Sequence, residues 1–137
     1  MKTIIAILYA HLVKRRNKQW IENPIKWQTN TLKKLIKNGI KTEFGKNHDF
    51  ENIYSYEQYR EKVPVRDYEE LRPYIDKVVN GQKDILWPGK PLYFAKTSGT
   101  TSGAKYIPIT KESIKTHIRS ARDALLNYFL KTKNFKP

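Results

Sequence analysis

The 137-residue sequence contains no cysteine. This absence excludes a disulfide scaffold, a zinc site built on thiolates and a cysteine nucleophile. It fits a reducing compartment, and we expect a cytoplasmic protein. A chain of this length can bury roughly two thirds of its unfolded surface, so it is long enough for a hydrophobic core. Its hydrophobic content of 39% is not typical of a disordered chain.

Acidic residues are scarce, since 13 Asp and Glu stand against 27 Lys and Arg and leave a net charge of +14. Residues 1–46 hold 11 basic and 2 acidic groups, residues 47–95 hold 7 and 9, and residues 96–137 hold 9 and 2. The positive charge therefore gathers in the two ends of the sequence. A basic chain invites a nucleic-acid-binding function, which stays one alternative. A helical interaction module without a ligand is another.

Long apolar runs are also missing. Residues 4–13 are mostly apolar, but this run is too short to span a bilayer. No small-residue cleavage site follows it, and residues 14–18 are largely basic, so it does not match a signal peptide. As a helix it would place Ile4, Leu8 and Leu12 on one face. We expect this face to be buried or docked, rather than to bind a membrane surface.

Local signals predict several helices before residue 85. Pro24 suits the first position of a helix that ends near Gly39. Residues 40–53 are polar, contain a glycine and indicate a loop. Ser55 and Asp67 each begin a capping-box pattern, and the second helix should end near Gly81.

Two extended runs, residues 92–95 and 106–109, flank a polar loop and precede a last helix at 111–131. The apolar face of that helix comprises Ile114, Ile118, Ala121, Leu125 and Tyr128 or Phe129. The fold class is therefore α/β, mostly helical in residues 1–85, with a short β-hairpin at 92–109. So few strands cannot form an independently stable sheet. We expect residues 1–137 to be the N-terminal part of a single larger domain.

The loop at residues 96–105 has the composition of a phosphate-binding loop. It holds five hydroxyl side chains and two glycines, with a lysine at each end. Glycines allow close backbone approach, successive N–H groups can bind anions, and Lys105 offers a compact charge. An ordinary hairpin loop would have a similar composition. The spacing does not match a Walker A loop or a dinucleotide-binding fingerprint.

The stretch 97–101, Thr-Ser-Gly-Thr-Thr, resembles the phosphate-binding loop of the adenylate-forming superfamily. The extra Ser102 and the lack of a proline before Lys105 depart from the usual pattern of that superfamily. With these two differences, the loop resembles that of the Gretchen Hagen acyl acid–amido synthetase family, named for its auxin-responsive members. The stretches 42–45, 63–71 and 106–110 are similar to that family as well, so the resemblance covers roughly residues 42–128.

The resemblance implies a ligase that uses ATP and Mg²⁺ to activate a small carboxylic acid as an acyl-adenylate. The amine of an amino acid then attacks to give an amide, although the loop does not exclude a thioester product. It also implies a large α/β adenylating domain, of which this chain would be an inactive N-terminal segment. The residues implied to bind the ATP phosphates are Thr97, Ser98, Gly99, Thr100, Thr101, Ser102, Gly103 and Lys105.

Other candidate residues carry weaker signals. Arg119 or Arg122 could face a substrate carboxylate, with a solvated basic helix face as the alternative. His11, His48 and His117 lack the spacing of a metal site, and we expect them on the surface or on helix faces. We assign no catalytic residue and no metal ligand, and we expect neither a nucleic-acid partner nor a membrane span.

Overall fold

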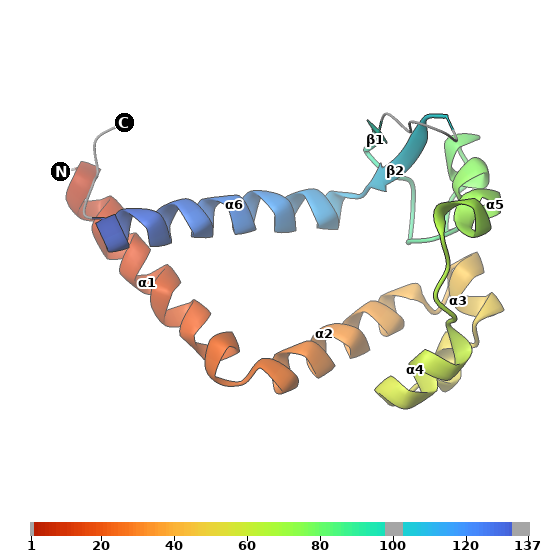
Figure 1. Ribbon diagram of the computed structural model, residues 1–137, viewed down its shortest axis with the longest axis horizontal. Helices are drawn as coiled ribbons and strands as arrows, with labels where there is room; N and C mark the ends of the chain where they lie inside the picture. The colour runs from red at the N-terminus through yellow and green to blue at the C-terminus, as the bar shows by residue number, and fades with distance from the viewer. Residues whose placement is uncertain (1, 98–102, 133–137) are drawn as a thin grey trace. The chain divides into compact units, whose positions relative to one another are not determined.

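The computed structural model describes residues 2–97 and 103–132. The chain divides into two compact units, one comprising residues 1–28 and 112–137 and the other residues 29–111. In chain order the elements labelled in Figure 1 are α1 (Lys2–Glu22), α2 (Pro24–Gly39), α3 (Glu43–Asn47), η1 (Phe50–Asn52), α4 (Tyr56–Lys62), α5 (Tyr68–Val79), β1 (Tyr93–Thr97), β2 (Lys105–Ile109) and α6 (Lys111–Thr132).

The first unit is held together by contacts between α1 and α6. Arg16 of α1 forms an ion pair with Asp123 of α6. The Arg122 guanidinium stacks over the ring of Tyr9, with 5.4 Å between the guanidinium carbon and the ring centroid. Such a cation–π contact is directional, so it fixes one helix face against the other.

The apolar face predicted for α1 is not the buried one. Ile4, Leu8 and Leu12 are 62–65% exposed, whereas Ala10 and Val13 are 0% and 2% exposed. Residues three positions apart share one side of a helix, so Ala10 and Val13 mark the side that is covered. A pair of helices buries only a narrow stripe of each, which is why the wider isoleucine and leucine face stays in contact with solvent.

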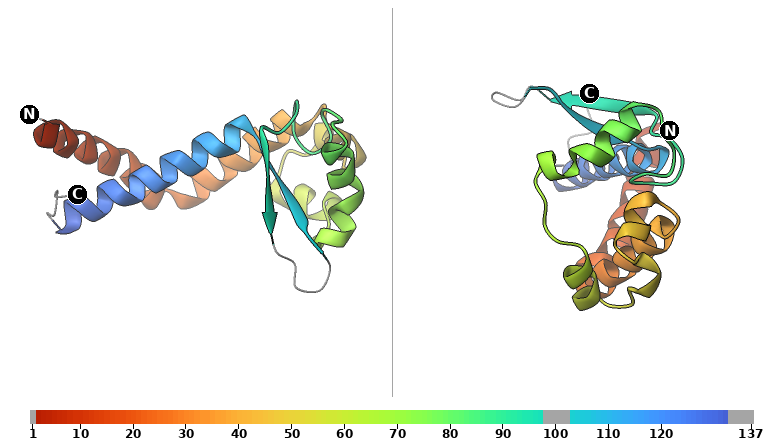
Figure 2. Two further views of the ribbon diagram at one scale, coloured as in Figure 1. Left: turned by 90° about the horizontal axis from the view of Figure 1, so that it is seen from above. Right: turned by 90° about the vertical axis from the view of Figure 1, so that its right-hand side faces the viewer.

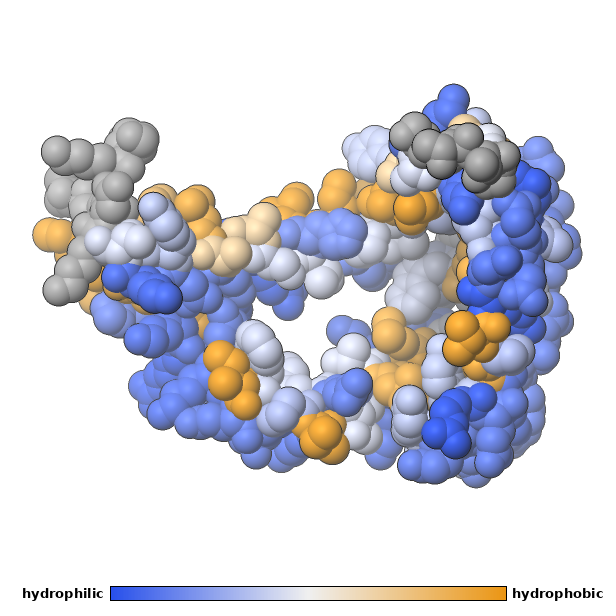
Figure 3. All heavy atoms as spheres, viewed as in Figure 1, coloured by the Kyte–Doolittle hydropathy of each residue, from blue (hydrophilic) through white to orange (hydrophobic). Residues whose placement is uncertain are grey.

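Much of the apolar face predicted for α6 is exposed as well, although Ile114 is partly buried. Ile118, Leu125 and Tyr128 are each more than half exposed. The partly covered side of α6 instead carries Arg122 and Asp123, followed by Leu126, Phe129 and Leu130. Figure 3 shows apolar residues on the surface of this helix. The predicted burial is therefore confirmed for Ile114 and for the Phe129 alternative, and it is wrong for Ile118, Leu125 and Tyr128.

The core of the second unit forms where the end of α2 meets η1 and α4. Ile36, Phe50 and Ile53 are buried together. Partly buried side chains pack around them, namely Leu32, Ile40, Phe44, Tyr59 and Val63. The Phe44 and Phe50 rings meet edge to face at 5.9 Å, an arrangement that aromatic pairs favour.

The segment predicted as a loop at residues 40–53 contains α3 and η1, so that prediction was wrong. The N-cap of α3 is Thr42, whose side chain is buried. Its hydroxyl donates to the Gly39 carbonyl at 2.7 Å and accepts from the Gly45 N–H at 3.0 Å. The two glycines bring the backbone so close that a Cβ on Gly45 would lie 2.0 Å from the Gly39 oxygen. A side chain at residue 45 is therefore incompatible with this turn.

The start of α3 is joined to the segment that follows α5. The N–H groups of Glu43 and Phe44 donate to the carbonyls of Asp84 and Ile85 at 2.7 and 2.9 Å. These bonds satisfy donors that a helix leaves unpaired in its first turn. The Glu43 carboxylate also accepts from the Lys77 ammonium of α5 at 2.6 Å.

Both predicted capping boxes are confirmed, at the start of α4 and of α5. The predicted stop at Gly81 is confirmed too. Gly81 has φ +84°, its N–H donates to the Val78 carbonyl, and the Gln82 N–H donates to the Lys77 carbonyl. This is the Schellman pattern, which ends helices at a left-handed glycine. Pro73 lies inside α5 without ending it.

β1 and β2 form an antiparallel pair that runs from Tyr93 opposite Ile109 to Thr97 opposite Lys105. The Phe94 and Tyr106 rings pack edge to face across the pair at 6.2 Å. β2 also contacts α5, and the two lie side by side in both views of Figure 2. The prediction of a mostly helical chain with one short hairpin is confirmed.

Because a Cβ at residue 45 would overlap the Gly39 carbonyl, alanine should destabilise the fold more at Gly45 than at Gly89, which has free space around it. We expect Gly45→Ala to destabilise the second unit by about 3 kcal/mol, because the new Cβ would overlap a backbone carbonyl that cannot move independently. Urea denaturation followed by circular dichroism measures this loss.

Gly89→Ala is the matched control, since Gly89 has φ +78° but nothing within 4 Å of an added Cβ. Only backbone strain of about 1 kcal/mol is expected there. Equal losses in the two variants would contradict the steric explanation.

Candidate functional site

The candidate site is the end of the hairpin where Thr97 and Lys105 face each other. These residues are the last of β1 and the first of β2, and they form a register pair. Antiparallel pairing brings the backbones of these two residues together. Thr97 is exposed and Lys105 is partly buried.

Gly103 has a backbone conformation suited to a tight loop. Its φ is +81°, in the left-handed region, and an added Cβ would meet nothing within 4 Å. Conformation, and not space, is therefore what favours glycine at this position. The predicted phosphate contacts at Ser98, Gly99, Thr100, Thr101 and Ser102 lie outside the described residues and stay predictions.

Lys105 faces an aromatic ring. Its ammonium lies 5.3 Å from the centroid of the Tyr68 ring, at the start of α5. The six ion pairs found among residues 2–97 and 103–132 do not include Lys105. A ring face attracts a cation but leaves its charge unneutralised. The ammonium can therefore still attract an anion.

The same tyrosine holds the backbone of β2. The Tyr68 hydroxyl accepts the Tyr106 N–H at 2.8 Å. Alternate residues of a paired strand direct their N–H groups away from the partner strand, and this bond satisfies one of them. In the sequence Tyr68 belongs to a capping pattern and to the stretch 63–71 that resembles the family, and neither feature predicts this contact. The signal for Tyr68 was an aromatic residue at the first position of a capped helix.

His48 is buried, which corrects the expectation that it lies on the surface or on a helix face. Its side chain is almost fully buried, at 5% exposure. Nδ1 lies 2.7 Å from the Phe44 carbonyl, and Nε2 lies 2.7 Å from a guanidinium nitrogen of Arg66. An N–H at Nδ1 and a lone pair at Nε2 satisfy both contacts, so they select one neutral tautomer. Spacing in the sequence held no signal for this contact.

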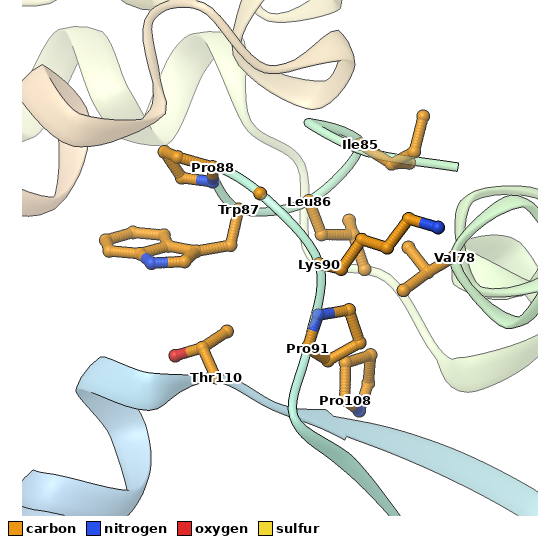
Figure 4. A pocket seen from close by; sticks show the side chains of 10 residues that line it. Val78, Ile85, Leu86, Trp87, Pro88, Lys90, Pro91, Pro108 and Thr110 are labelled. Carbon is orange, nitrogen blue, oxygen red and sulfur yellow. The ribbon is translucent and has the colours of Figure 1, made fainter. Parts of the chain in front are cut away.

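A small hollow beside the hairpin is no ligand pocket. Figure 4 shows Pro91 beside Pro108, and Trp87 near Thr110. The free space is about 20 Å³, which suits about one water molecule. An acyl acid or a nucleotide cannot enter it.

The described residues contain neither a metal-binding cluster nor a membrane-spanning helix. No group of three or more His, Asp or Glu side chains there could hold a metal ion. No helix within residues 2–97 and 103–132 is both long enough and apolar enough to cross a membrane.

The sequence profile of the GH3 family N-terminal domain matches residues 13–136. The chain belongs to the GH3 family. This match confirms the resemblance noted at residues 42–45, 63–71 and 97–110.

Plant relatives in the GH3 family have named activities. The chain is 34% identical over 76 residues to the probable indole-3-acetic acid-amido synthetase GH3.13 of Oryza sativa subsp. japonica, covering 53% of this chain and 16% of that protein. It is 30% identical over 94 residues to the indole-3-acetic acid-amido synthetase GH3.2 of Arabidopsis thaliana, covering 67% and 17%. It is 33% identical over 79 residues to the 4-substituted benzoates-glutamate ligase GH3.12 of Arabidopsis thaliana, covering 57% and 14%.

These relatives are named amido synthetases or ligases, so GH3 is a family of ligases. The chain spans 14–17% of the length of these three relatives. The match therefore concerns the N-terminal part of the GH3 architecture. The activity of a whole GH3 protein is a separate question.

The arginines named as possible GH3 substrate contacts lie on α6, in the first unit. Arg119 is exposed. Arg122 donates to the Asp123 carboxylate at 2.9 Å and stacks on Tyr9. Within this unit Arg122 therefore has a structural role, and contact of either arginine with a substrate stays a prediction.

The Asp123 carboxylate predicts a pH-dependent stability of the first unit. Burial raises its pKa, but hydrogen bonds from Arg122 and Arg16 outweigh this effect and hold the pKa of Asp123 below its ordinary value of 3.8. A carboxyl with a depressed native pKa stabilises the fold above its ordinary pKa, and this stabilisation disappears as the pH falls through the native pKa.

We therefore expect the urea midpoint to fall less steeply in Asp123→Asn than in the wild type between roughly pH 5 and pH 2.5. Asp76→Asn, which removes an exposed carboxyl from α5, is the control and should follow the wild type. Parallel curves for the wild type and Asp123→Asn would contradict this role of Asp123.

Proposed function

We propose that this chain supplies the ATP-phosphate-binding segment of a GH3 acyl acid–amido synthetase. The observation that carries the proposal is the hairpin end, where Lys105 faces Thr97 across the strand pair and follows Gly103 at φ +81°. A left-handed glycine allows backbone N–H groups to converge on an anion. A lysine whose charge is not neutralised adds a compact cation.

The residues present fit a nucleoside triphosphate and its magnesium ion. Mg²⁺ in nucleotide sites is held largely by phosphate oxygens and water, with few protein ligands. A segment that binds phosphates therefore does not need a cluster of carboxylates. ATP supplies the AMP group that activates the carboxylic acid for attack by an amine.

In this proposal the chain acts by placement. Thr97 offers a hydroxyl, Gly103 allows close backbone approach, and Lys105 stabilises negative charge on the phosphates. Fixed donors and cations of this kind lower the barrier of phosphoryl and nucleotidyl transfer because they need no rearrangement when charge develops. The names of the relatives support an acyl acid and an amino acid as the partners of the reaction. A cytoplasmic location stays a prediction.

Lys105 gives the direct test. We expect MgATP to bind the chain, and Lys105→Ala to weaken binding at least about tenfold through loss of a charge-assisted contact. Isothermal titration calorimetry measures the dissociation constants. Lys83→Ala removes an equal charge from an exposed position of the same unit and should leave the affinity unchanged.

Equal affinities for the two variants would contradict a phosphate-binding role of Lys105. The same titration with duplex and single-stranded oligonucleotides tests the nucleic-acid alternative. Non-specific polyanion binding would decline steeply with salt and respond alike to both lysines.

The chain alone should not catalyse the first half-reaction. The chain matches only 14–17% of the length of the three relatives, so we expect the residues that bind the rest of the nucleotide to belong to other parts of a GH3 protein. We expect no ATP–pyrophosphate exchange above background with indole-3-acetate or a 4-substituted benzoate. Robust exchange by the purified chain would contradict the proposal that other parts of a GH3 protein are required.

A further inference from the structure

One side chain, Tyr68, contacts both residues that begin β2. Its hydroxyl accepts the Tyr106 N–H at 2.8 Å, and its ring lies 5.3 Å from the Lys105 ammonium. The first contact fixes the strand backbone, and the second restricts the lysine side chain. No feature of the family match or of the relatives' names assigns this residue a role.

The backbone of Tyr68 is itself tightly fixed. The residue before it, Asp67, caps α5 by accepting the Glu70 N–H at 2.9 Å, and the Glu70 carboxylate accepts the Asp67 N–H at 2.8 Å. This reciprocal pair defines where the helix begins. The preceding Arg66 contacts the buried His48 at 2.7 Å and lies 5.9 Å from the centroid of the Phe44 ring.

These contacts link the core of the second unit to the first residues of β2. His48 and Phe44 belong to the α3 region, Arg66 and Asp67 precede α5, and Tyr68 reaches β2. Arg66, Asp67 and Tyr68 are consecutive in the chain, and the contacts at the two ends of this segment are hydrogen bonds and ring contacts. The strand end therefore rests on α5 and not on β1 alone.

We propose that Tyr68 is a positioning residue for phosphate binding by Lys105, holding the β2 backbone through its hydroxyl and the Lys105 ammonium through its ring. This inference rests on the proposed function of the loop. A lysine side chain has four rotatable bonds, and confining it before the ligand arrives reduces the entropy lost on binding. The ring confines the ammonium but leaves its charge unneutralised, whereas a carboxylate would neutralise that charge.

Two substitutions separate the two contacts. Tyr68→Phe keeps the ring and removes the hydroxyl, so the Tyr106 amide loses its acceptor. Tyr68→Leu removes the ring as well. In Tyr68→Phe we expect Tyr106 amide hydrogen exchange to be about tenfold faster and MgATP affinity to be about fivefold lower, the size of effect expected for one hydrogen bond.

The ring contact has its own spectroscopic signature. The Tyr68 ring current should shift the side-chain methylene resonances of Lys105 in the wild type. We expect that shift to persist in Tyr68→Phe, to disappear in Tyr68→Leu, and MgATP affinity to fall further in the second variant.

Tyr74→Phe is the matched control. Tyr74 also lies on α5, and its hydroxyl accepts a hydrogen bond from the Asn47 side chain at 3.0 Å. This variant loses a comparable bond and a comparable amount of stability. It should leave Tyr106 exchange and MgATP affinity at wild-type values.

The outcomes distinguish the inference from the function on which it rests. Wild-type MgATP binding that Tyr68→Phe and Tyr68→Leu leave unchanged would overturn the positioning role while the proposed function stands. Absence of wild-type MgATP binding would overturn the phosphate-loop assignment. If amide hydrogen exchange at Tyr106 still depended on Tyr68 in that case, the hydrogen bond would anchor β2 without serving MgATP binding. Equal effects of Tyr68→Phe and Tyr74→Phe would reduce Tyr68 to general stability and overturn the proposal.

Discussion

The second unit depends on a backbone contact between Gly39 and Gly45 that leaves no room for a side chain. The Thr42 hydroxyl bonds to both glycines and begins α3 at the point where α2 has ended. The direction of α3 determines where its first N–H groups point, and they meet the carbonyls of Asp84 and Ile85. One close approach therefore sets both the α2–α3 turn and the position of the segment that leads into the hairpin.

At the hairpin end Tyr68 both accepts the Tyr106 N–H and faces the Lys105 ammonium. Lys105 has no carboxylate partner in the described part of the chain. Other cations of the second unit do form ion pairs, as Lys77 does with Glu43 and Lys62 with Asp49. Lys105 differs because an aromatic face orients it. A ring-bound lysine two residues after Gly103 concentrates positive potential where an anionic ligand would arrive.

Local features of the sequence predicted local features of the structure. The capping boxes at Ser55 and Asp67, the stop at Gly81 and the hairpin each depend on residues close in the sequence. The α3 helix was missed because it is stabilised by carbonyls about forty residues away, and no periodicity reports such contacts. The burial of His48 and the exposure of Ile118 were missed for the same reason, since both depend on which element covers which side.

The hairpin also has a consequence for the order of folding. Its strands pair residues that are close in sequence, from Thr97 with Lys105 to Tyr93 with Ile109. Local pairs of this kind close in about 1–10 μs, whereas contacts between distant segments form later because more chain entropy must be lost. The strands that frame the loop can therefore pair before α5 docks. Tyr68 would then be among the last side chains to reach its native contacts, after the frame it supports is already closed.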